Sequence, residues 1–187
     1  MLYTVMDLEA YRDEGIEARK NIDIVQIRKI ADGIIEAFNR NGKLIVFGNG
    51  GSAADAQHFV AELTGHFLKE RKALPAMALT TNTSALTAIG NDYSFKDIFS
   101  RQIEALCKKE DYVIGISTSG NSINVIDGLK KASEIGAFTL GFTGKNGGKM
   151  NEICNSVFHA ESNKTSIIQE IHITAIHMIS ALVEEHY

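Results

Sequence analysis

Apolar side chains in the first quarter of the chain recur every three to four residues, which is the spacing of one face of an α-helix. This pattern predicts two amphipathic helices within residues 5–41, with a break near Asn21–Asp23, and Asn41-Gly42 predicts the end of the second. We expect a helical segment in this place to cap a sheet or to pack against a partner subunit. The apolar face of the second helix consists of Ile24, Ile27, Ile30, Ile34 and Phe38.

Beyond residue 43, short apolar runs alternate with helical patterns. The runs predict strands at Leu44–Phe47, Ala76–Leu79, Tyr112–Ile116, Phe138–Phe142 and Ser156–Ala160. The intervening patterns predict helices at Ser52–Gly65, Thr83–Ile89, Phe95–Cys107, Ser122–Ile135 and Thr165–Glu185, with a turn at Gly90-Asn91-Asp92. Such alternation is typical of right-handed βαβ units, so we predict an α/β fold of three layers with a doubly wound parallel sheet. The length and the lack of a linker favour one domain over residues 1–187, which includes the helical segment 1–41.

Two loops rich in glycine and serine follow predicted strands, GNGGS after the first and STSGNS after the third. Doubly wound sheets bind ligands beyond the carboxyl ends of their strands, so both loops are predicted to line one site. STSGNS also opens a helix, whose free N–H groups and positive dipole end favour an anion. A helix N-cap alone would need only one serine. The hydroxyls of Ser117, Thr118, Ser119 and Ser122 therefore predict a phosphate-binding loop.

The GNGGS loop fits the glycine pattern of dinucleotide-binding folds through Gly48, Gly50 and Ala53. Those folds place an acidic residue at the end of the next strand to bind a ribose. Here that strand ends in the sequence LTTN, which has no acid, and neither loop has the Gly-Lys-Ser/Thr of a P-loop. We therefore expect no nucleotide cofactor.

The helix after GNGGS carries His58 and Glu62, which lie four residues apart on one face. Such a pair often makes only a surface hydrogen bond. The predicted helix Thr165–Glu185, however, carries polar residues on its apolar face, and a buried polar side chain must be hydrogen-bonded or serve a function. His58 and Glu62 with a histidine of that helix would suit Zn²⁺ or a similar cation, and Gln169 could complete the site. The spacing does not choose between His172 and His177. His66, His159 and His186 are assigned to structural or surface roles.

Converting a ketose to an aldose requires a base beside the carbonyl and an acid or metal at its oxygen. A carboxylate and an imidazole next to a phosphate-binding loop are the minimal set for this reaction on a sugar phosphate. Partial burial would raise the pKa of Glu62, as a base needs, whereas a bound cation would lower it. The sequence leaves both roles of Glu62 open.

Composition and charge exclude several classes of protein. Hydrophobic residues make up 44% and charged residues 22%, which is typical of a globular chain. A net charge of −4 gives no general attraction to nucleic acid or to an anionic membrane. Cys107 and Cys154 have no metal-binding spacing and are expected to be reduced thiols. The N-terminus lacks the apolar run of a secretory signal, and Ile167–Val183 is judged too short and too polar to cross a bilayer, so we expect a cytoplasmic protein.

Several motifs together resemble the phosphoheptose isomerases of the sugar-isomerase (SIS) group, also called sedoheptulose 7-phosphate isomerases. The motifs are FGNGGSAADAQHFVAELTG, GND, ISTSGNS, TGKNGGKM and the terminal IQEIH followed by a second histidine, and the similarity runs from about residue 40 to the end. The two glycine- and serine-rich loops indicate the SIS group. The HxxxE and QExH elements narrow the resemblance to the phosphoheptose isomerases within that group.

The resemblance implies a flavodoxin-like five-stranded parallel sheet and a homotetramer with sites at subunit interfaces. It implies conversion of sedoheptulose 7-phosphate to D-glycero-D-manno-heptose 7-phosphate through an enediol, the first step toward ADP- or GDP-heptose for surface glycans. Glu62 and His177 would be the acid–base pair, and His58, Glu62, Gln169 and His177 would bind one Zn²⁺ per subunit. The phosphate would lie on Ser117, Thr118, Ser119 and Ser122, and the sugar on Asn49, Gly50, Gly51, Ser52, Asn91, Asp92, Glu62 and Gln169.

The chain departs from the family pattern just before Gln169. Members often carry an arginine two residues before this glutamine and some carry an acid before that, where this chain has Ser166 and Ile167. An interface or substrate contact would be lost with the arginine. The alternative to an isomerase is a non-catalytic SIS module that binds a sugar phosphate or a replication-initiator protein. That alternative shares the loops but has no use for the full set of histidines, Glu62 and Gln169.

Overall fold

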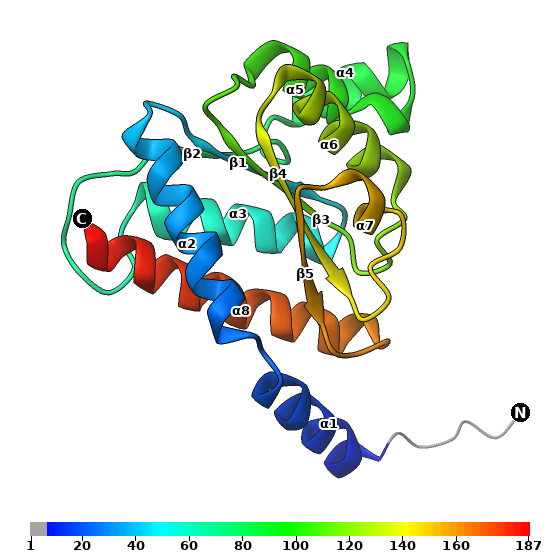
Figure 1. The fold of residues 1–187 in the computed structure, drawn as a ribbon. Helices are drawn as coiled ribbons and strands as arrows, with labels where there is room; N and C mark the ends of the chain where they lie inside the picture. The colour runs from blue at the N-terminus through cyan, green and yellow to red at the C-terminus, as the bar shows by residue number, and fades with distance from the viewer. Residues whose placement is uncertain (1–6) are drawn as a thin grey trace, which may run out of the picture.

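The computed structural model describes residues 7–187, so the first two residues of the predicted N-terminal helix, and the first six residues of the segment considered for a secretory signal, lie outside it. At its centre is a parallel sheet of five strands in the order β2-β1-β3-β4-β5 (Figure 1). The order reverses direction beside β1, as in doubly wound folds. The strands are β1 (Leu44–Gly48), β2 (Ala76–Ala78), β3 (Tyr112–Ile116), β4 (Phe138–Gly144) and β5 (Ser156–Ala160). The predicted α/β class and five-stranded parallel sheet are confirmed.

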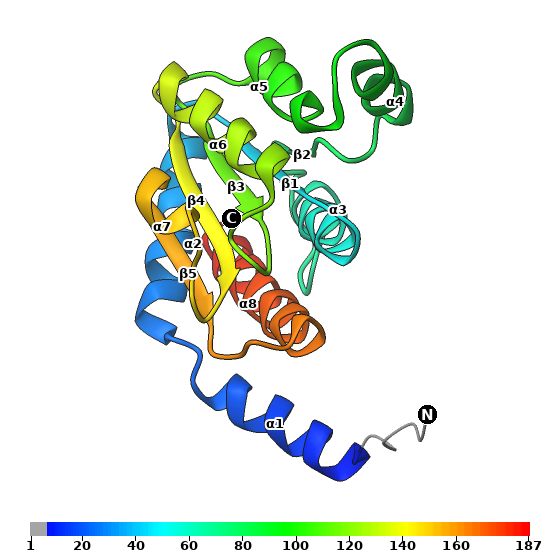
Figure 2. The same cartoon turned by 90° about the vertical axis from the view of Figure 1, so that its right-hand side faces the viewer.

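Helices cover both faces of the sheet (Figures 1 and 2). Strand β1 alternates between two cores, because Leu44 and Val46 pack on one face and Ile45 and Phe47 on the other. One face is covered by α2 (Ile24–Asn39), α3 (Gly51–Thr64) and α8 (Thr165–His186), with α1 (Leu8–Lys20) against α8. The other is covered by α6 (Ile123–Ile135), α5 (Ser100–Leu106) and α7 (Met150–Ile153), with α4 (Thr83–Asp92) beyond β2.

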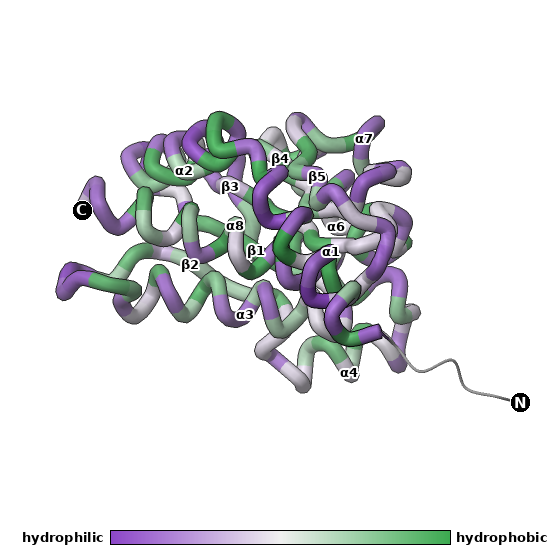
Figure 3. Tube along the Cα trace, turned by 90° about the horizontal axis from the view of Figure 1, so that it is seen from below, coloured by the Kyte–Doolittle hydropathy of each residue, from purple (hydrophilic) through white to green (hydrophobic). Residues whose placement is uncertain are grey.

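The helices on the first face are amphipathic, as their spacing predicts. Hydrophobic and hydrophilic residues alternate within each turn along α2 and α3 (Figure 3). In α2 the residues Ile27, Ile30 and Ile34 are buried, and Asp23 accepts a hydrogen bond from the backbone N–H of Gln26 at 3.0 Å. This N-cap satisfies a free donor of the first turn and begins the helix at the predicted break.

Helix α8 corrects one expectation. Its 22 residues are long and apolar enough, by length and composition, to cross a membrane, so the argument that this stretch is too short and too polar is wrong. Its apolar residues nevertheless lie in the core between α2, α3 and the sheet, where Ile168, Ile171 and Ile176 are at most 2% exposed. A helix that packs against its own sheet in this way uses its apolar face for folding.

The region between β2 and β3 also differs from expectation. The predicted turn at Gly90-Asn91-Asp92 is the last part of α4, because a glycine without close neighbours is tolerated in a helix. The predicted helix Phe95–Cys107 is a 3-10 turn, η1 (Phe95–Asp97), followed by α5. Ser94 starts η1 by accepting a hydrogen bond from the backbone N–H of Lys96 at 3.2 Å. Helix α7 was not predicted, since one turn is too short for a periodic pattern.

Candidate functional site

His58, Glu62 and His177 come together on the outer side of α3 and α8. These two helices run in the same direction, since Gly51 lies against Gln169 at one end and His58 against His177 two turns later. The Nε2 atom of His58 is 2.7 Å from Oε1 of Glu62 and 3.1 Å from Nε2 of His177. One ligand atom from each residue lies within 4.8 Å of the other two. We call these three residues the triad.

The triad fits a zinc ion. Two imidazoles and a carboxylate are typical zinc ligands, and ligands arranged tetrahedrally about zinc lie roughly 3.3 Å from one another. The separations of 2.7 and 3.1 Å are near this spacing. Nε2 of His58 faces both the Glu62 carboxylate and Nε2 of His177, and it has only one proton to donate to either of them. The side chain of Glu62 is 19% exposed, which leaves the group reachable by a small substrate.

The structure distinguishes the two candidate histidines of α8. His172 is fully buried and its Nε2 lies 3.0 Å from the carbonyl oxygen of Thr143. Burial lowers the pKa of His172 to about 4, although the Thr143 contact opposes the shift, and the ring therefore stays neutral in the core. His177 lies in the triad. Of the two histidines that the spacing left open, the structure places only His177 beside His58 and Glu62.

Gln169 lies at the other end of the same helix face. Its side-chain amide packs on the backbone of Gly51, where a Cβ would come within 2.3 Å of Nε2. Gln169 and His177 are eight positions apart in α8, which is roughly 12 Å along the helix axis. The structure therefore places Gln169 beside the GNGGS loop. Of the four predicted zinc ligands, the other three form the triad.

The serine-rich loop forms a cluster of hydroxyls at the carboxyl end of β3. Oγ of Ser117 lies 2.9 Å from that of Ser122 and 3.4 Å from that of Ser119. Gly120 has a positive φ of 65°, and a Cβ there would come within 2.0 Å of the Gly147 carbonyl oxygen. Only glycine allows this close approach of the two loops.

The loop after β4 closes over this cluster, which the sequence analysis did not foresee. A cavity of about 350 Å³ lies between the two loops, lined by Thr118, Ser119, Asn121, Gly144, Lys145, Asn146, Gly147, Gly148, Ser162, Asn163 and Ile168. Lys145 lines this cavity, and its Nζ lies 3.2 Å from Oε2 of Glu161, so this cation beside the serine-rich loop is paired with a carboxylate. The GKNGGK motif at the same sheet edge could have indicated this neighbour.

The GNGGS loop is joined to the serine-rich loop through Asn49. Its side-chain amide exchanges two hydrogen bonds of 2.8 Å with that of Asn124 in the first turn of α6. Gly50 has a positive φ of 57°, and Ser52 is buried at the start of α3. The sequence analysis missed Asn124, for which a buried polar residue in an otherwise apolar helix face was the available signal.

Asn91 and Asp92 lie apart from these groups. They end α4 as exposed residues, and Nδ2 of Asn91 donates to Oδ1 of Asp92 at 2.8 Å. Helix α4 lies at the opposite side of the molecule from α8 (Figures 1 and 2). Within one chain, the structure does not bring these two predicted sugar-binding residues to the triad.

Asp55 is a further acidic group that the sequence analysis missed. It precedes His58 by one turn of α3, and its Oδ2 is buried without a hydrogen-bond partner among residues 7–187. Burial raises the pKa of Asp55 to about 6, and the nearby His58 partly offsets this. In the sequence, only its place in the DAQHFVAE stretch, one helical turn before His58, could have identified Asp55 as a residue near the triad.

Comparisons with known proteins agree with one another. The SIS domain family matches residues 10–144. A probable phosphoheptose isomerase from Thermoplasma volcanium is 60% identical over 185 residues, covering 99% of this chain and 94% of that relative. The phosphoheptose isomerase of Aquifex aeolicus is 58% identical over 160 residues, covering 86% of this chain and 84% of that relative.

Solved structures give the same result. Phosphoheptose isomerase GmhA from Neisseria gonorrhoeae superposes with a TM-score of 0.88 at 41% identity, covering 95% of this chain and 97% of that chain. The phosphoheptose isomerase from Francisella tularensis has a TM-score of 0.91 at 32% identity, covering 95% and 96%. With its parallel sheet, its two sheet-edge loops and these relatives, the chain belongs to the SIS-domain family and, within it, to the phosphoheptose isomerases.

Proposed function

We propose that this protein is a sugar-phosphate isomerase that converts sedoheptulose 7-phosphate to D-glycero-D-manno-heptose 7-phosphate. The observation that carries the proposal is the triad, in which a carboxylate and two imidazoles from separate helices meet within 4.8 Å. A chain that only binds sugar phosphates has no need of this set. The relatives at 58–60% identity, which bear the name phosphoheptose isomerase, support the choice of substrate.

The residues of the triad suit a proton-transfer mechanism through an enediol. Glu62 removes the proton from C1 of the ketose, and the electrons move to form the double bond between C1 and C2. His177 donates a proton to the carbonyl oxygen at C2 as the enediol forms. Return of a proton to C2 and loss of the C1 hydroxyl proton then give the aldose. The carboxylate and the imidazole lie close enough to act on adjacent carbon and oxygen atoms.

The same residues are suited to hold a zinc ion, one per subunit. His58, Glu62 and His177 would bind it, with Gln169 as a fourth ligand after movement of its side chain toward the triad. When bound, the ion would supply Lewis-acid polarisation of the carbonyl oxygen. No nucleotide cofactor is needed for this reaction.

The serine-rich loop is the proposed phosphate site. Ser117, Thr118, Ser119 and Ser122 offer hydroxyl donors at the N-terminus of α6, where the helix dipole favours an anion. These groups hold a phosphate without a permanent basic clamp, as suits a substrate that must leave. The sugar would extend from there along Asn49, Gly50, Gly51 and Ser52.

We further propose a homotetramer with its sites at subunit interfaces. The cavity beside the serine-rich loop is lined by residues other than the triad, and helix α4, which ends in Asn91 and Asp92, lies far from α8 (Figure 2). Residues from a neighbouring copy would bring the missing groups to the triad. As one SIS domain over residues 1–187 acting in the cytoplasm, the protein would begin the synthesis of nucleotide-activated heptose for lipopolysaccharide, capsule or surface-layer glycans.

A turnover experiment tests the proposal. Purified protein is incubated with sedoheptulose 7-phosphate and zinc, and NMR follows the appearance of the aldose. Glu62→Gln is expected to lower kcat about 10³-fold, within the usual contribution of general acid–base catalysis. Glu36→Gln, which alters an exposed carboxylate of α2, is the matched control and should match the wild type. Absence of aldose product from the wild-type protein would reject the isomerase and favour the non-catalytic SIS module, and a panel of ketose phosphates defines the sugar length.

A further inference from the structure

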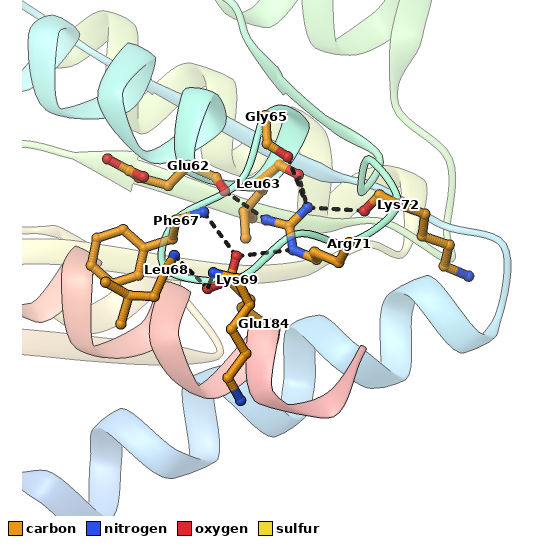
Figure 4. Close-up of polar contacts among 9 residues, drawn as sticks. All are labelled: Glu62, Leu63, Gly65, Phe67, Leu68, Lys69, Arg71, Lys72 and Glu184. Carbon is orange, nitrogen blue, oxygen red and sulfur yellow. Dashed lines mark hydrogen bonds and ion pairs between the residues drawn. The ribbon is translucent and has the colours of Figure 1, made fainter.

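The segment between α3 and β2 is held by two buried charged residues. Residues 65–75 have no regular secondary structure, yet the side chains of Arg71, within this segment, and Glu184, in α8, are only 3% and 2% exposed. Nε of Arg71 lies 3.3 Å from Oε1 of Glu184 (Figure 4). Among residues 7–187, Nε of Arg71 has this ion-pair contact but no hydrogen-bond partner. Burial of a charged pair is costly unless hydrogen bonds compensate for it, so the other polar atoms of the pair must supply them.

Arg71 binds the C-terminal end of α3. Its Nη2 donates to the carbonyl oxygen of Glu62 at 2.7 Å, and its Nη1 donates to that of Leu63 at 2.9 Å (Figure 4). The same Nη1 also reaches the carbonyl oxygens of Gly65 and Lys72, at 3.1 and 2.9 Å. The last carbonyls of a helix have no partner within it and carry the negative end of its dipole, so a guanidinium is well suited to them. Arg71 thereby fixes the backbone at Glu62, a member of the triad.

Glu184 binds the following segment from α8. Its carboxylate accepts hydrogen bonds from three consecutive backbone N–H groups, those of Phe67 at 2.8 Å, Leu68 at 2.6 Å and Lys69 at 3.0 Å. Burial alone would raise the pKa of Glu184, but these three donors and Arg71 outweigh it and the pKa is lowered. Glu184 therefore stays ionised and folds residues 67–69 onto the last part of α8.

This folding places the ring of Phe67 on His177. The two rings are stacked, with centroids 5.6 Å apart and planes 12° from parallel. On another side, the ring of His177 contacts the ring of His58, with centroids 5.0 Å apart and an angle of 61° between the ring planes. Phe67 thus limits rotation of the imidazole whose Nε2 must point at His58. The backbone N–H of Phe67 is itself one of the three held by Glu184.

We propose that Arg71, Glu184 and Phe67 form a positioning device for the triad, in which the buried ion pair folds residues 65–72 so that Phe67 fixes the ring of His177 and Arg71 fixes the backbone of Glu62. None of the three touches the substrate in the proposed reaction. Their contacts end on two of the three triad residues, from both helices that carry the triad. Groups that orient metal-binding or catalytic side chains in this way change affinity and rate about 10- to 100-fold when removed.

This inference deepens the proposed function and rests on it for the role of the triad. The test compares Phe67→Ala with Leu68→Ala, because Leu68 is the next residue in the same segment and its side chain is 71% exposed. Phe67→Tyr keeps the stacked ring and serves as the conservative variant. Three properties are measured: the ring-proton NMR shifts of His177, the affinity of the metal-free protein for zinc in competition with a chelator, and kcat and KM with sedoheptulose 7-phosphate.

Phe67→Ala is expected to move the His177 ring-proton shifts, to weaken zinc binding about tenfold and to lower kcat about tenfold with KM nearly unchanged. Phe67→Tyr and Leu68→Ala should match the wild type in all three. Glu184→Gln should show the same losses as Phe67→Ala, and because this variant can also fail to fold, Phe67→Ala carries the decision. Equal zinc affinity and unchanged His177 shifts in Phe67→Ala would overturn the inference. The shifts and the zinc affinity need no substrate, so they decide this point even where the wild type fails to isomerise the sugar and the proposed function falls.

Discussion

Replacement of His172 by glutamine separates the buried histidine of α8 from the histidine of the triad. His172 is fully buried against the Phe142 ring, and its Nε2 contacts the Thr143 carbonyl oxygen. Glutamine can keep a donor toward this carbonyl but does not titrate. We therefore expect His172→Gln to retain isomerase activity and to change how stability depends on pH.

The magnitude follows from the pKa of His172. The pKa is 6.5 for an ordinary histidine and about 4 here, so between these values the unfolded chain binds a proton that the folded chain does not. The contribution of the neutral His172 to the free energy of unfolding is therefore fully present above pH 6.5 and is lost as the pH falls toward 4. The total loss is about 3 kcal/mol, at 1.36 kcal/mol per pH unit. Between pH 7.5 and pH 5 the expected loss is about 2 kcal/mol. Asp55, whose pKa is raised, acts in the opposite direction in both proteins and cancels in the comparison.

Urea unfolding at pH 7.5 and pH 5 measures this difference, at one protein concentration and with chelator present. The wild type and the control His66→Gln, which alters an exposed histidine, should lose about 2 kcal/mol more than His172→Gln. Equal losses in all three proteins would refute the assignment of His172 to the core as a neutral ring. A loss of activity in His172→Gln comparable with that of His177→Gln would refute its separation from the site.

Three further predictions concern the loops at the sheet edge. Gly120→Ala should destabilise the fold by about 1–3 kcal/mol in urea unfolding, because Gly120 has a positive φ. Gly90→Ala in α4 should instead stabilise the fold by up to about 1 kcal/mol. Equal effects of the two changes would contradict the close approach of the loops. Asn124→Ala should cost about 1–3 kcal/mol of stability and raise KM, since Asn49 loses both hydrogen bonds, and an unchanged KM would show that the amide pair does not organise the site. Ser122→Ala should raise KM about tenfold, because the substrate phosphate loses one hydrogen bond. Ser84→Ala, on the exposed part of α4, should leave KM unchanged. Equal KM values in the two variants would show that Ser122 does not bind the phosphate.

The sequence was sufficient for the fold because its patterns are local. The apolar runs at Leu44–Phe47 and Tyr112–Ile116 were strands, and the alternation of strands and helices allowed few topologies. The errors came from local exceptions, such as Gly90 continuing a helix and the single turn of α7. The membrane criterion failed at α8 because a core helix and a spanning helix have similar composition.

The candidate site was predictable in part for the same reason. His58 and Glu62 share a helix face by spacing, but the choice of His177 over His172 depends on how α8 is rotated against α3, which spacing does not determine. The Asn49–Asn124 pair, the loop after β4 and the Arg71–Glu184 pair join residues that are distant in sequence. Local signals mark some of these residues singly, such as the GKNGGK motif and the polar Asn124, but only tertiary packing determines which residues meet.

The measurement that tests the central claim most directly is the turnover of sedoheptulose 7-phosphate by Glu62→Gln, His177→Gln and the variant with both changes. If the two side chains act as one catalytic unit, each single change lowers kcat by about 10³-fold and the double variant is little worse than either. The proteins should keep the wild-type size in solution. Losses that multiply in the double variant, or a single variant with wild-type kcat, would contradict a shared site.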